Sequence, residues 1–428
     1  MPERRRTMTL QKPSSLSARL ANASILLYLF WLLLPAVQTT GRALTGVAAV
    51  ALFGAAVIAD TEYLKQSWLS TLLRAVCAAA IPLLMRFFLR RGGANFAGFY
   101  VQQAMFWFPL VFAGYARERG DSRLWRWVKP LMLAVVTVTT LTTIGWLIQG
   151  MLRGGRVYAY SRSLGYAGEG REAYLKELML RNIGGYDFIY ATVVSLPLTC
   201  LGVQRSRGWA RAGYGALLAA QAVMVALSQY TYAMVFTAAI LVVEGVAAAV
   251  RALSRGRLGM GASLLWGAAP LAVVILLREP LVSLAAQVCG SLGLTNFAHS
   301  FEMLLGALHG GGLGGESRLT YYLTALEGFR QSPLLGGMLG GEPLLSLHSD
   351  LLDLLSGMGV LGAALVGGMI YLMGRGLLRS VRRSPARAQL VMMTVALFAC
   401  ALLGTVVYSR DILAVAAMGT LLVLEGEA

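Results

Sequence analysis

Charged residues are scarce in this chain. Asp, Glu, Lys and Arg make up 13% of its 428 residues, whereas 57% are hydrophobic. A soluble globular domain has about 25% charged residues, so the composition excludes that class. Apolar stretches of about 20 residues recur along the sequence, and each is long enough to cross a hydrocarbon core of about 30 Å. The sequence therefore predicts an all-α integral membrane protein.

Histidine and cysteine are also rare, with three histidines and four cysteines in the whole chain. No cysteines have the spacing of a zinc site or of a Cys-x-x-Cys pair. Cys77, Cys200 and Cys400 fall inside apolar stretches, and only Cys289 is predicted to reach an outer loop. We therefore expect neither a disulfide framework nor a bound metal.

Acidic residues number 20 against 37 lysines and arginines, which gives a formal net charge of +17. In a soluble protein this excess would suggest nucleic acid as a partner. In a membrane protein, cations gather in the cytoplasmic loops, and an anionic substrate would account for others. We therefore expect the lipid bilayer, and no nucleic acid, among the partners.

About twelve apolar stretches use most of the chain, so residues 1–428 are predicted to form a single polytopic membrane domain. The predicted spans are residues 23–40, 43–59, 67–88, 95–115, 130–151, 186–203, 212–228, 231–250, 262–286, 349–373, 389–408 and 411–424. Arg74 lies inside the third of these spans and is expected to face the interior of the bundle.

The distribution of cations predicts the orientation of the chain. Arginines or lysines gather before residue 20 and in the connections at 117–129, 205–211, 251–257 and 375–387. A twelve-span count places all of these segments on one side, which the positive-inside rule assigns to the cytoplasm. Both termini are then cytoplasmic, and the first apolar segment is retained as a span. Arg90 and Arg91 fall on the outer side in this count and do not follow the rule.

Two long outer loops follow from this topology, at residues 152–185 and 287–347. Long loops without linker composition are usually functional, and we expect these to form short amphipathic helices over the membrane bundle. The first mixes arginines with tyrosines, which fits either an interfacial helix or a surface for sugars and phosphates. Arg181, near the end of this loop, and Arg278, before the second loop, are candidates for binding a diphosphate.

The second outer loop begins with a Gly-rich run at 310–315 and then contains Arg318, Tyr321 and Tyr322. A turn-rich segment, 332–341, leads to His348 at the start of a long apolar helix. Gly-rich turns let backbone N–H groups approach an anion, although many loops are Gly-rich for steric reasons alone. A histidine in this position serves either as a base or only as part of the helix start.

These motifs together resemble one family. Arg318, the Tyr-Tyr and Ala-Leu stretch after it, Ser332-Pro-Leu-Leu-Gly-Gly, His348 and Gly357-Met-Gly-Val-Leu-Gly resemble the O-antigen ligase and O-antigen polymerase superfamily. The resemblance is specific over about residues 316–365, and the number of spans and the large late loop are similar over the whole length. It implies a GT-C-like glycosyltransferase architecture in the bacterial cytoplasmic membrane.

The resemblance also implies a reaction. Glycan would pass from an undecaprenyl-diphosphate carrier to a hydroxyl of an acceptor glycan at the outer face of the membrane, without metal, nucleotide sugar or other cofactor. His348 would be the base, because imidazole takes up a proton near neutral pH. Arg318 would stabilise the diphosphate leaving group. Tyr321, Tyr322 and Ser349 would contact the substrate.

Two positions depart from the family pattern. The family usually has Asn after the histidine, whereas this chain has Ser349, which can still cap a helix or donate a hydrogen bond. A Ser-Arg-Gly motif between two middle spans is replaced by residues 228–233, which lack the arginine, so no phosphate-binding role is assigned there. Asp350 and Asp353 either interact with the helix dipole, or one of them orients His348. Asp350 is the poorer candidate because of its position around the helix.

Several functions remain open at this point. The leading hypothesis is a polysaccharide polymerase, and the alternative in the same family is a ligase that attaches glycan to a lipid A core or a protein. A lipid-linked oligosaccharide flippase would need two matching halves and a cationic central cavity, and no internal repeat is visible. A metal-dependent polyprenyl-phosphate-sugar transferase would place acidic residues in the first outer loop, which here reads Gln38-Thr-Thr-Gly-Arg and has no carboxylate, so this function is set aside.

Overall fold

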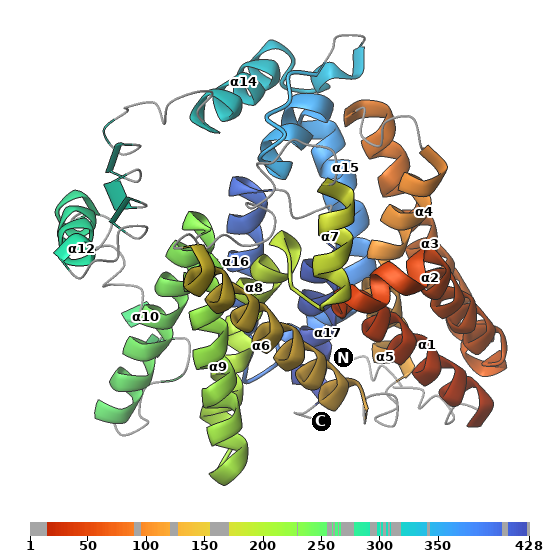
Figure 1. Ribbon diagram of the computed structural model, residues 1–428. Helices are drawn as coiled ribbons and strands as arrows, with labels where there is room; N and C mark the ends of the chain where they lie inside the picture. Colours follow the sequence, from red (N-terminus) through yellow and green to blue (C-terminus); the bar gives the residue numbers. More distant parts are fainter. Residues whose placement is uncertain are drawn as a thin grey trace.

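The computed structural model describes residues 15–89, 96–119, 127–154, 171–228, 230–254, 278–291, 318–339, 343–404 and 410–425, with a few isolated residues between 259 and 309. Within these residues all regular structure is helical (Figure 1). Seven helices are long and apolar enough to cross a membrane: α1 (Ser15–Leu33), α3 (Thr61–Leu89), α6 (Val128–Gly154), α8 (Tyr186–Arg205), α9 (Gly208–Ser228), α10 (Thr231–Leu253) and α15 (Asp350–Val381). The chain is therefore an all-helical, multi-pass membrane protein, as its composition predicts.

Other helices coincide with predicted spans but are bent or short. The helix α2 (Pro35–Ile58) is bent by 89° between Gly41 and Leu44, and it is an eighth span if its two parts are taken together. The predicted span 95–115 consists of α4 (Phe96–Phe106) and α5 (Phe108–Arg119), which are separated at Trp107. The apolar helices α16 (Arg387–Leu403) and α17 (Arg410–Glu425) have 17 and 16 residues. Most of the predicted span 262–286 lies outside the described residues.

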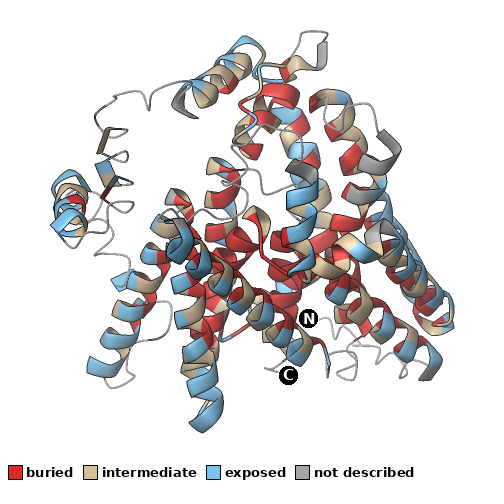
Figure 2. Ribbon diagram, viewed as in Figure 1, coloured by how far each residue is buried: buried red, intermediate tan, exposed pale blue. Residues whose placement is uncertain are grey.

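The helix α8 lies at the centre of the bundle and packs against α9, α10, α16 and α17, while α15 packs on α3 and α5. Buried residues gather in the middle of the bundle, whereas much of α9, α10 and α12 (Arg278–Ser291) is exposed (Figure 2). Large apolar side chains are exposed on α3, with Phe87 at 72% and Trp68 at 53%. Contiguous apolar surface of this kind marks contact with a membrane, so these side chains fit lipid rather than water.

Two ion pairs, one buried and one partly buried, hold α5 against its neighbours. The side chain of Arg74 is 2% exposed, and its guanidinium pairs with both carboxylate oxygens of Glu118. The guanidinium of Arg119 pairs in the same way with Asp60, which also accepts a hydrogen bond of 3.0 Å from the hydroxyl of Tyr115. Charges inside a membrane bundle are normally paired in this way. The prediction that Arg74 faces the interior is confirmed, and Glu118 is its partner.

The described part of the first outer loop differs from its predicted position over the bundle. The helix α7 (Arg171–Leu180) packs against α2 and is followed by Asn182 in the left-handed conformation (φ 58°), which Asn tolerates at a helix end. The hydroxyl of Thr142 donates to the carbonyl oxygen of Asn182 (2.6 Å), and the Asn182 side chain donates to the hydroxyl of Thr139 (3.0 Å). Both threonines lie midway along α6, so residues 171–185 return to the bundle between its ends. Residues 155–170 lie outside the described part of the chain.

Candidate functional site

The predicted site surrounds the first turn of α15, at one end of the bundle (Figure 1). Two elements of the second outer loop pack there on α15: helix α14 (Arg318–Gln331) and the short 3-10 helix η3 (Gly336–Leu339). The predicted start of this loop, residue 287, falls inside α12. The Gly-rich run 310–315 lies outside the described residues.

His348 lies in a tight turn that is stabilised by hydrogen bonds to the buried carboxylate of Asp353. Asp353 is 0% exposed, and its Oδ1 accepts hydrogen bonds from the N–H (2.6 Å) and the hydroxyl (2.7 Å) of Ser346. Its Oδ2 accepts the N–H of Leu347 (3.1 Å). The Ser346 Oγ in turn accepts the N–H groups of His348 (3.1 Å) and Ser349 (2.9 Å). A buried network in which each member is satisfied fixes a single geometry, so the backbone that carries the imidazole is held in one place.

The residues after His348 start the helix. Ser349 is the N-cap of α15, and its Oγ accepts the N–H of Leu352 (3.2 Å). This is the capping role predicted for the residue that replaces the family's asparagine. Asp353 lies in the first turn, where a carboxylate also interacts favourably with the helix dipole. Its three hydrogen bonds favour the second predicted role, in which it positions His348 through Ser346.

The backbone of Leu347, the residue before His348, is strained. It has a φ of 58° and is 56% exposed. The left-handed conformation costs a non-glycine residue about 1–2 kcal/mol, and such strain persists only where the surrounding structure enforces it. The bond from its N–H to Asp353 supplies that constraint.

The turn at residues 332–337 packs into a break in α15. At Gly359 the backbone leaves the helical region (φ 62°, ψ −171°). The N–H groups of the next two residues, Val360 and Leu361, donate to carbonyl oxygens of the turn, at Pro333 (2.9 Å) and Leu334 (3.1 Å). The helix is therefore divided at Gly359, and hydrogen bonds across the break attach the loop to it.

The two glycine motifs of the sequence meet at this break. Gly336 also has a positive φ (58°), and a Cβ there would lie 2.5 Å from the backbone nitrogen of Gly359. A Cβ at Gly359 would lie 2.3 Å from the carbonyl carbon and oxygen of Leu334. Glycine is needed at both positions because two backbones touch there. The sequence left two interpretations of such Gly-rich turns open, an anion site or a steric requirement, and in this turn backbone packs against backbone.

Helix α14 brings one predicted residue to His348. The rings of Tyr321 and His348 are 5.0 Å apart between centroids, with their planes inclined by 56°. The hydroxyl of Tyr322 donates to the carbonyl oxygen of Leu403 (3.2 Å), which ties α14 to the end of α16. Arg318 is the first residue of α14, three positions before Tyr321 and therefore about 60° from it around the helix. The side chain of Arg318 lies outside the described residues.

The other two predicted diphosphate ligands lie elsewhere. Arg181 is exposed at the end of α7 and pairs with Glu177 (2.5 Å). Arg278 is the exposed first residue of α12, which lies apart from α14 and α15 (Figure 1). Arg278 is therefore not brought to His348, and Arg181 is engaged in an ion pair of its own helix.

A tyrosine cluster adjoins the site and was not predicted. Tyr186 and Tyr190 of α8 and Tyr230, just before α10, have ring centroids 4.6 to 6.2 Å apart. Gly404 accepts the N–H of Asp350 (3.2 Å), and a Cβ at Gly404 would lie 2.8 Å from the hydroxyl of Tyr186. The cluster thus reaches the first turn of α15. One sequence signal could have identified this cluster. Tyr186 and Tyr190 are four residues apart, which places them on one helix face.

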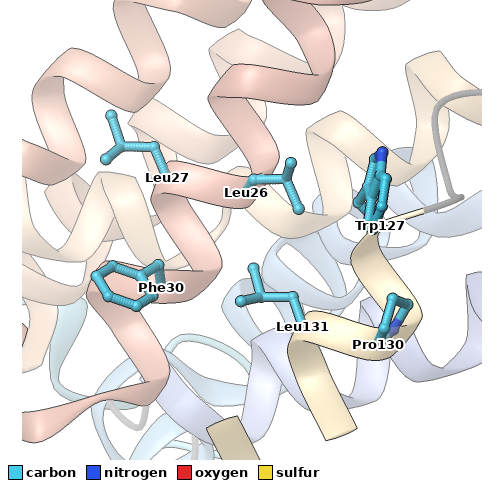
Figure 3. Close-up of a pocket in the computed structure, with 6 residues that line it drawn as sticks. All are labelled: Leu26, Leu27, Phe30, Trp127, Pro130 and Leu131. Carbon is cyan, nitrogen blue, oxygen red and sulfur yellow. The ribbon is translucent and has the colours of Figure 1, made fainter. Parts of the chain in front are cut away.

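One further hollow lies away from this site. A groove between α1 and the start of α6 is lined by apolar side chains alone: Leu26, Leu27, Phe30, Trp127, Pro130 and Leu131 (Figure 3). It offers no group for chemistry and suits lipid chains. Among the described residues, no three His, Cys, Asp or Glu side chains form a group that could hold a metal ion.

Replacing Asp353 with asparagine tests the positioning role. We expect Asp353→Asn to lower the free energy of unfolding by about 1–3 kcal/mol, because an amide N–H2 would face an N–H donor that now meets a carboxylate oxygen. Thermal unfolding of the purified protein in detergent measures this. The control is Glu327→Gln, an exposed carboxylate on α14, for which a change within about 0.5 kcal/mol is expected. Equal losses in both variants would contradict the role.

The arrangement can perform acid–base chemistry. An imidazole carried by a hydrogen-bonded turn at the end of the bundle, and flanked by an aromatic ring, is suited to taking a proton from a bound hydroxyl. This interpretation of the site rests on the described contacts alone. Comparison of the chain with protein family models gave no match, and a search of curated proteins gave none either.

Proposed function

We propose that this chain is a polysaccharide polymerase, which transfers glycan from an undecaprenyl-diphosphate carrier to a hydroxyl of an acceptor glycan. The observation that carries the proposal is the hydrogen-bonded turn that presents His348 beside the helix starting at Arg318. The motifs that resemble the O-antigen ligase and polymerase superfamily all fall in residues 316–365. The described helices of this segment, α14, η3 and α15, also pack on one another, and Tyr321 of α14 contacts His348.

In the proposed reaction, the imidazole of His348 takes the proton of the acceptor hydroxyl as its oxygen attacks the anomeric carbon of the donor. The bond from that carbon to the diphosphate oxygen breaks, and undecaprenyl diphosphate leaves with the bonding electrons. Arg318 stabilises the negative charge that collects on the leaving group. A metal ion, nucleotide sugar or other cofactor has no role in this scheme. The imidazolium then returns its proton to solvent.

The remaining predicted residues take different parts in the proposal. Tyr321 flanks the imidazole and offers an aromatic face to a sugar ring. Tyr322 and Ser349 bond to backbone groups, so we assign them to the support of the site rather than to the substrate. Arg181 and Arg278 are left without a role in the transfer.

The proposal includes a twelve-span, GT-C-like architecture in the bacterial cytoplasmic membrane, with both termini cytoplasmic and the site outside. One contact supports this orientation. The Nε of Arg117 donates to the hydroxyl of Ser380 (2.9 Å), so the C-terminal ends of α5 and α15, both rich in arginine, lie together. His348 is at the opposite end of α15. The positive-inside rule then places His348 on the outer side.

The glycan profile of a deletion strain tests the function. For a polymerase, we expect long glycan chains to disappear while single carrier-derived units are still attached, and the intact gene to restore the chains. Electrophoresis of the surface glycan separates these products. Long chains that persist on the carrier without attachment would indicate the ligase, and carrier-linked units trapped on the inner side would indicate a flippase. Either result, or an unchanged profile, would overturn the polymerase.

A further inference from the structure

A group of arginines surrounds the connection between α15 and α16, at the end of α15 opposite to His348. These five residues form the arginine face: Arg375, Arg379, Arg382, Arg383 and Arg387. All are exposed except Arg375, which is half-buried. The sequence has no Asp or Glu between Asp353 and Asp411, so the arginines have no acidic neighbour along the chain. The proposed transfer uses none of them.

Three of these arginines form a stripe along α15. Arg375, Arg379 and Arg382 are spaced by four and three residues, so they leave the helix within about 60° of one another. Residues at these spacings are neighbours on a helix surface. The positive-inside rule accounts for cations at this end of the bundle, but it does not require them to share one side of a helix. The stripe therefore concentrates positive charge in one place.

The stripe continues an apolar side of α15. Tyr371 is four residues before Arg375 and Leu378 is four residues before Arg382, so both lie on the same side of the helix as the arginines. Tyr371 is 55% exposed and Leu378 is 44% exposed. Large apolar side chains that are exposed on a membrane helix fit lipid chains. The lipid-facing side of α15 thus ends in arginines, at the depth where lipid head groups lie.

The helix α16 has the same arrangement in the reverse order. Arg387 is its first residue. Exposed apolar residues then follow on the same side of the helix, at spacings of four, four and three: Val391, Val395 and Phe398. Both helices therefore present an apolar surface that is bordered by arginine.

A tight turn joins the two helices. The N–H of Arg383 donates to the carbonyl oxygen of Ser380 (3.0 Å), and the N–H of Ser384 donates to that of Val381 (3.2 Å). The N–H of Ala386 donates to the hydroxyl of Ser384 (3.0 Å). The connection is therefore short and hydrogen-bonded, and it keeps the arginines at the end of α15 close to the one that starts α16.

Acidic groups on the helices that pack against α15 are paired with other cations. The helix α15 packs on α3 and α5. Glu118 of α5 pairs with Arg74, and Asp60, just before α3, pairs with Arg119. Positive charge is therefore in excess at this end of α15, and it attracts an anion.

We propose that the arginine face binds the head group of an anionic phospholipid, with the acyl chains against the apolar sides of α15 and α16. Clusters of four to eight lysines or arginines directly after a membrane helix are typical of sites for anionic lipids. The charge selects the head group, and the exposed apolar side chains add contact with the chains. This site does not depend on the transfer proposed for His348, so a failure of either proposal leaves the other intact.

Native mass spectrometry of the delipidated full-length protein tests this site. The probes are dioleoyl phosphatidylglycerol, dioleoyl phosphatidylcholine and glycerol 3-phosphate. We expect phosphatidylglycerol to bind in preference to phosphatidylcholine. The triple variant Arg379→Gln/Arg382→Gln/Arg387→Gln should weaken its binding by roughly ten- to hundredfold, because each cation near an anionic lipid contributes about fivefold. All three side chains are exposed, so the variant is expected to fold, and its thermal unfolding in detergent checks this.

The matched control removes the same charge from other helices. Lys129→Gln/Arg207→Gln/Arg211→Gln replaces three exposed cations of α6 and α9 or next to them, and it should change the affinity less than threefold. Raising the salt concentration from about 0.1 M to about 0.5 M should weaken binding to the parent protein, because the site is exposed. Equal losses in the two triple variants, no preference for phosphatidylglycerol, or glycerol 3-phosphate binding as tightly as the lipid would each overturn the proposal.

Discussion

Replacing His348 with alanine is expected to reduce the rate of glycan transfer by about 10²- to 10⁴-fold, the range that a positioned general base contributes. The variant removes the imidazole but keeps the turn, because the hydrogen bond from residue 348 to Ser346 uses the backbone N–H. The thermal stability of the variant should therefore stay close to that of the parent. The assay is single-turnover transfer in proteoliposomes with a synthetic undecaprenyl-diphosphate glycan as donor.

A second histidine provides the control for this experiment. His299 is 71% exposed, and its Nδ1 lies 3.9 Å from the carboxylate of Glu302. We expect His299→Ala to keep the parental rate within about twofold, since surface substitutions away from special features change little. If His348→Ala retained a rate comparable with that of His299→Ala while folding normally, the imidazole would not be the base.

Replacing Gly359 with alanine is expected to destabilise the site more than any other single methyl group added to α15. The backbone at Gly359 lies in a region that is essentially restricted to glycine, which costs other residues about 1–3 kcal/mol. The new Cβ would also lie 2.3 Å from backbone atoms of Leu334, and overpacking of this kind costs a further 1–3 kcal/mol or so. We therefore expect a clearly lower unfolding temperature in detergent and a loss of transfer, because the turn at 332–337 must move.

A second glycine of the same helix provides a control, for which we expect stabilisation instead of destabilisation. Gly367 lies eight residues further along α15, and a Cβ there would have no atom within 4 Å. Gly367→Ala should stabilise the protein by up to about 1 kcal/mol, because alanine is the better helix former. A Gly359→Ala variant as stable as Gly367→Ala would show that the loop does not enter the helix.

Local features of the sequence predicted much of this arrangement. The start of α15 was expected at residue 349 and is seen at Asp350, with Ser349 as its cap, because capping depends on a few neighbouring residues. The buried position of Arg74 followed from the cost of a charge facing lipid. The membrane class followed from composition alone. In each case the feature depends on residues that are adjacent in the sequence or on the surrounding medium, which is water or lipid.

Features that depend on distant contacts were not predicted. Glu118 could not be named as the partner of Arg74, because 44 positions separate the two residues in the sequence. The contact between Gly336 and Gly359 was missed for the same reason: each glycine motif was visible, but their close approach depends on how the loop folds back. The break at Trp107 and the contact of Asn182 with the middle of α6 likewise depend on tertiary packing.

The hydrogen bonds at Gly359 also impose an order on the assembly of the protein. Translation produces the turn at 332–337 before the N–H groups of Val360 and Leu361 that bind to it. The turn therefore leaves the ribosome without its partner and stays so until α15 has entered the bilayer. The packing around the turn that carries His348 is completed only when that late helix is inserted, so a chain truncated before Gly359 can place most of its helices in the membrane and still lack the candidate site.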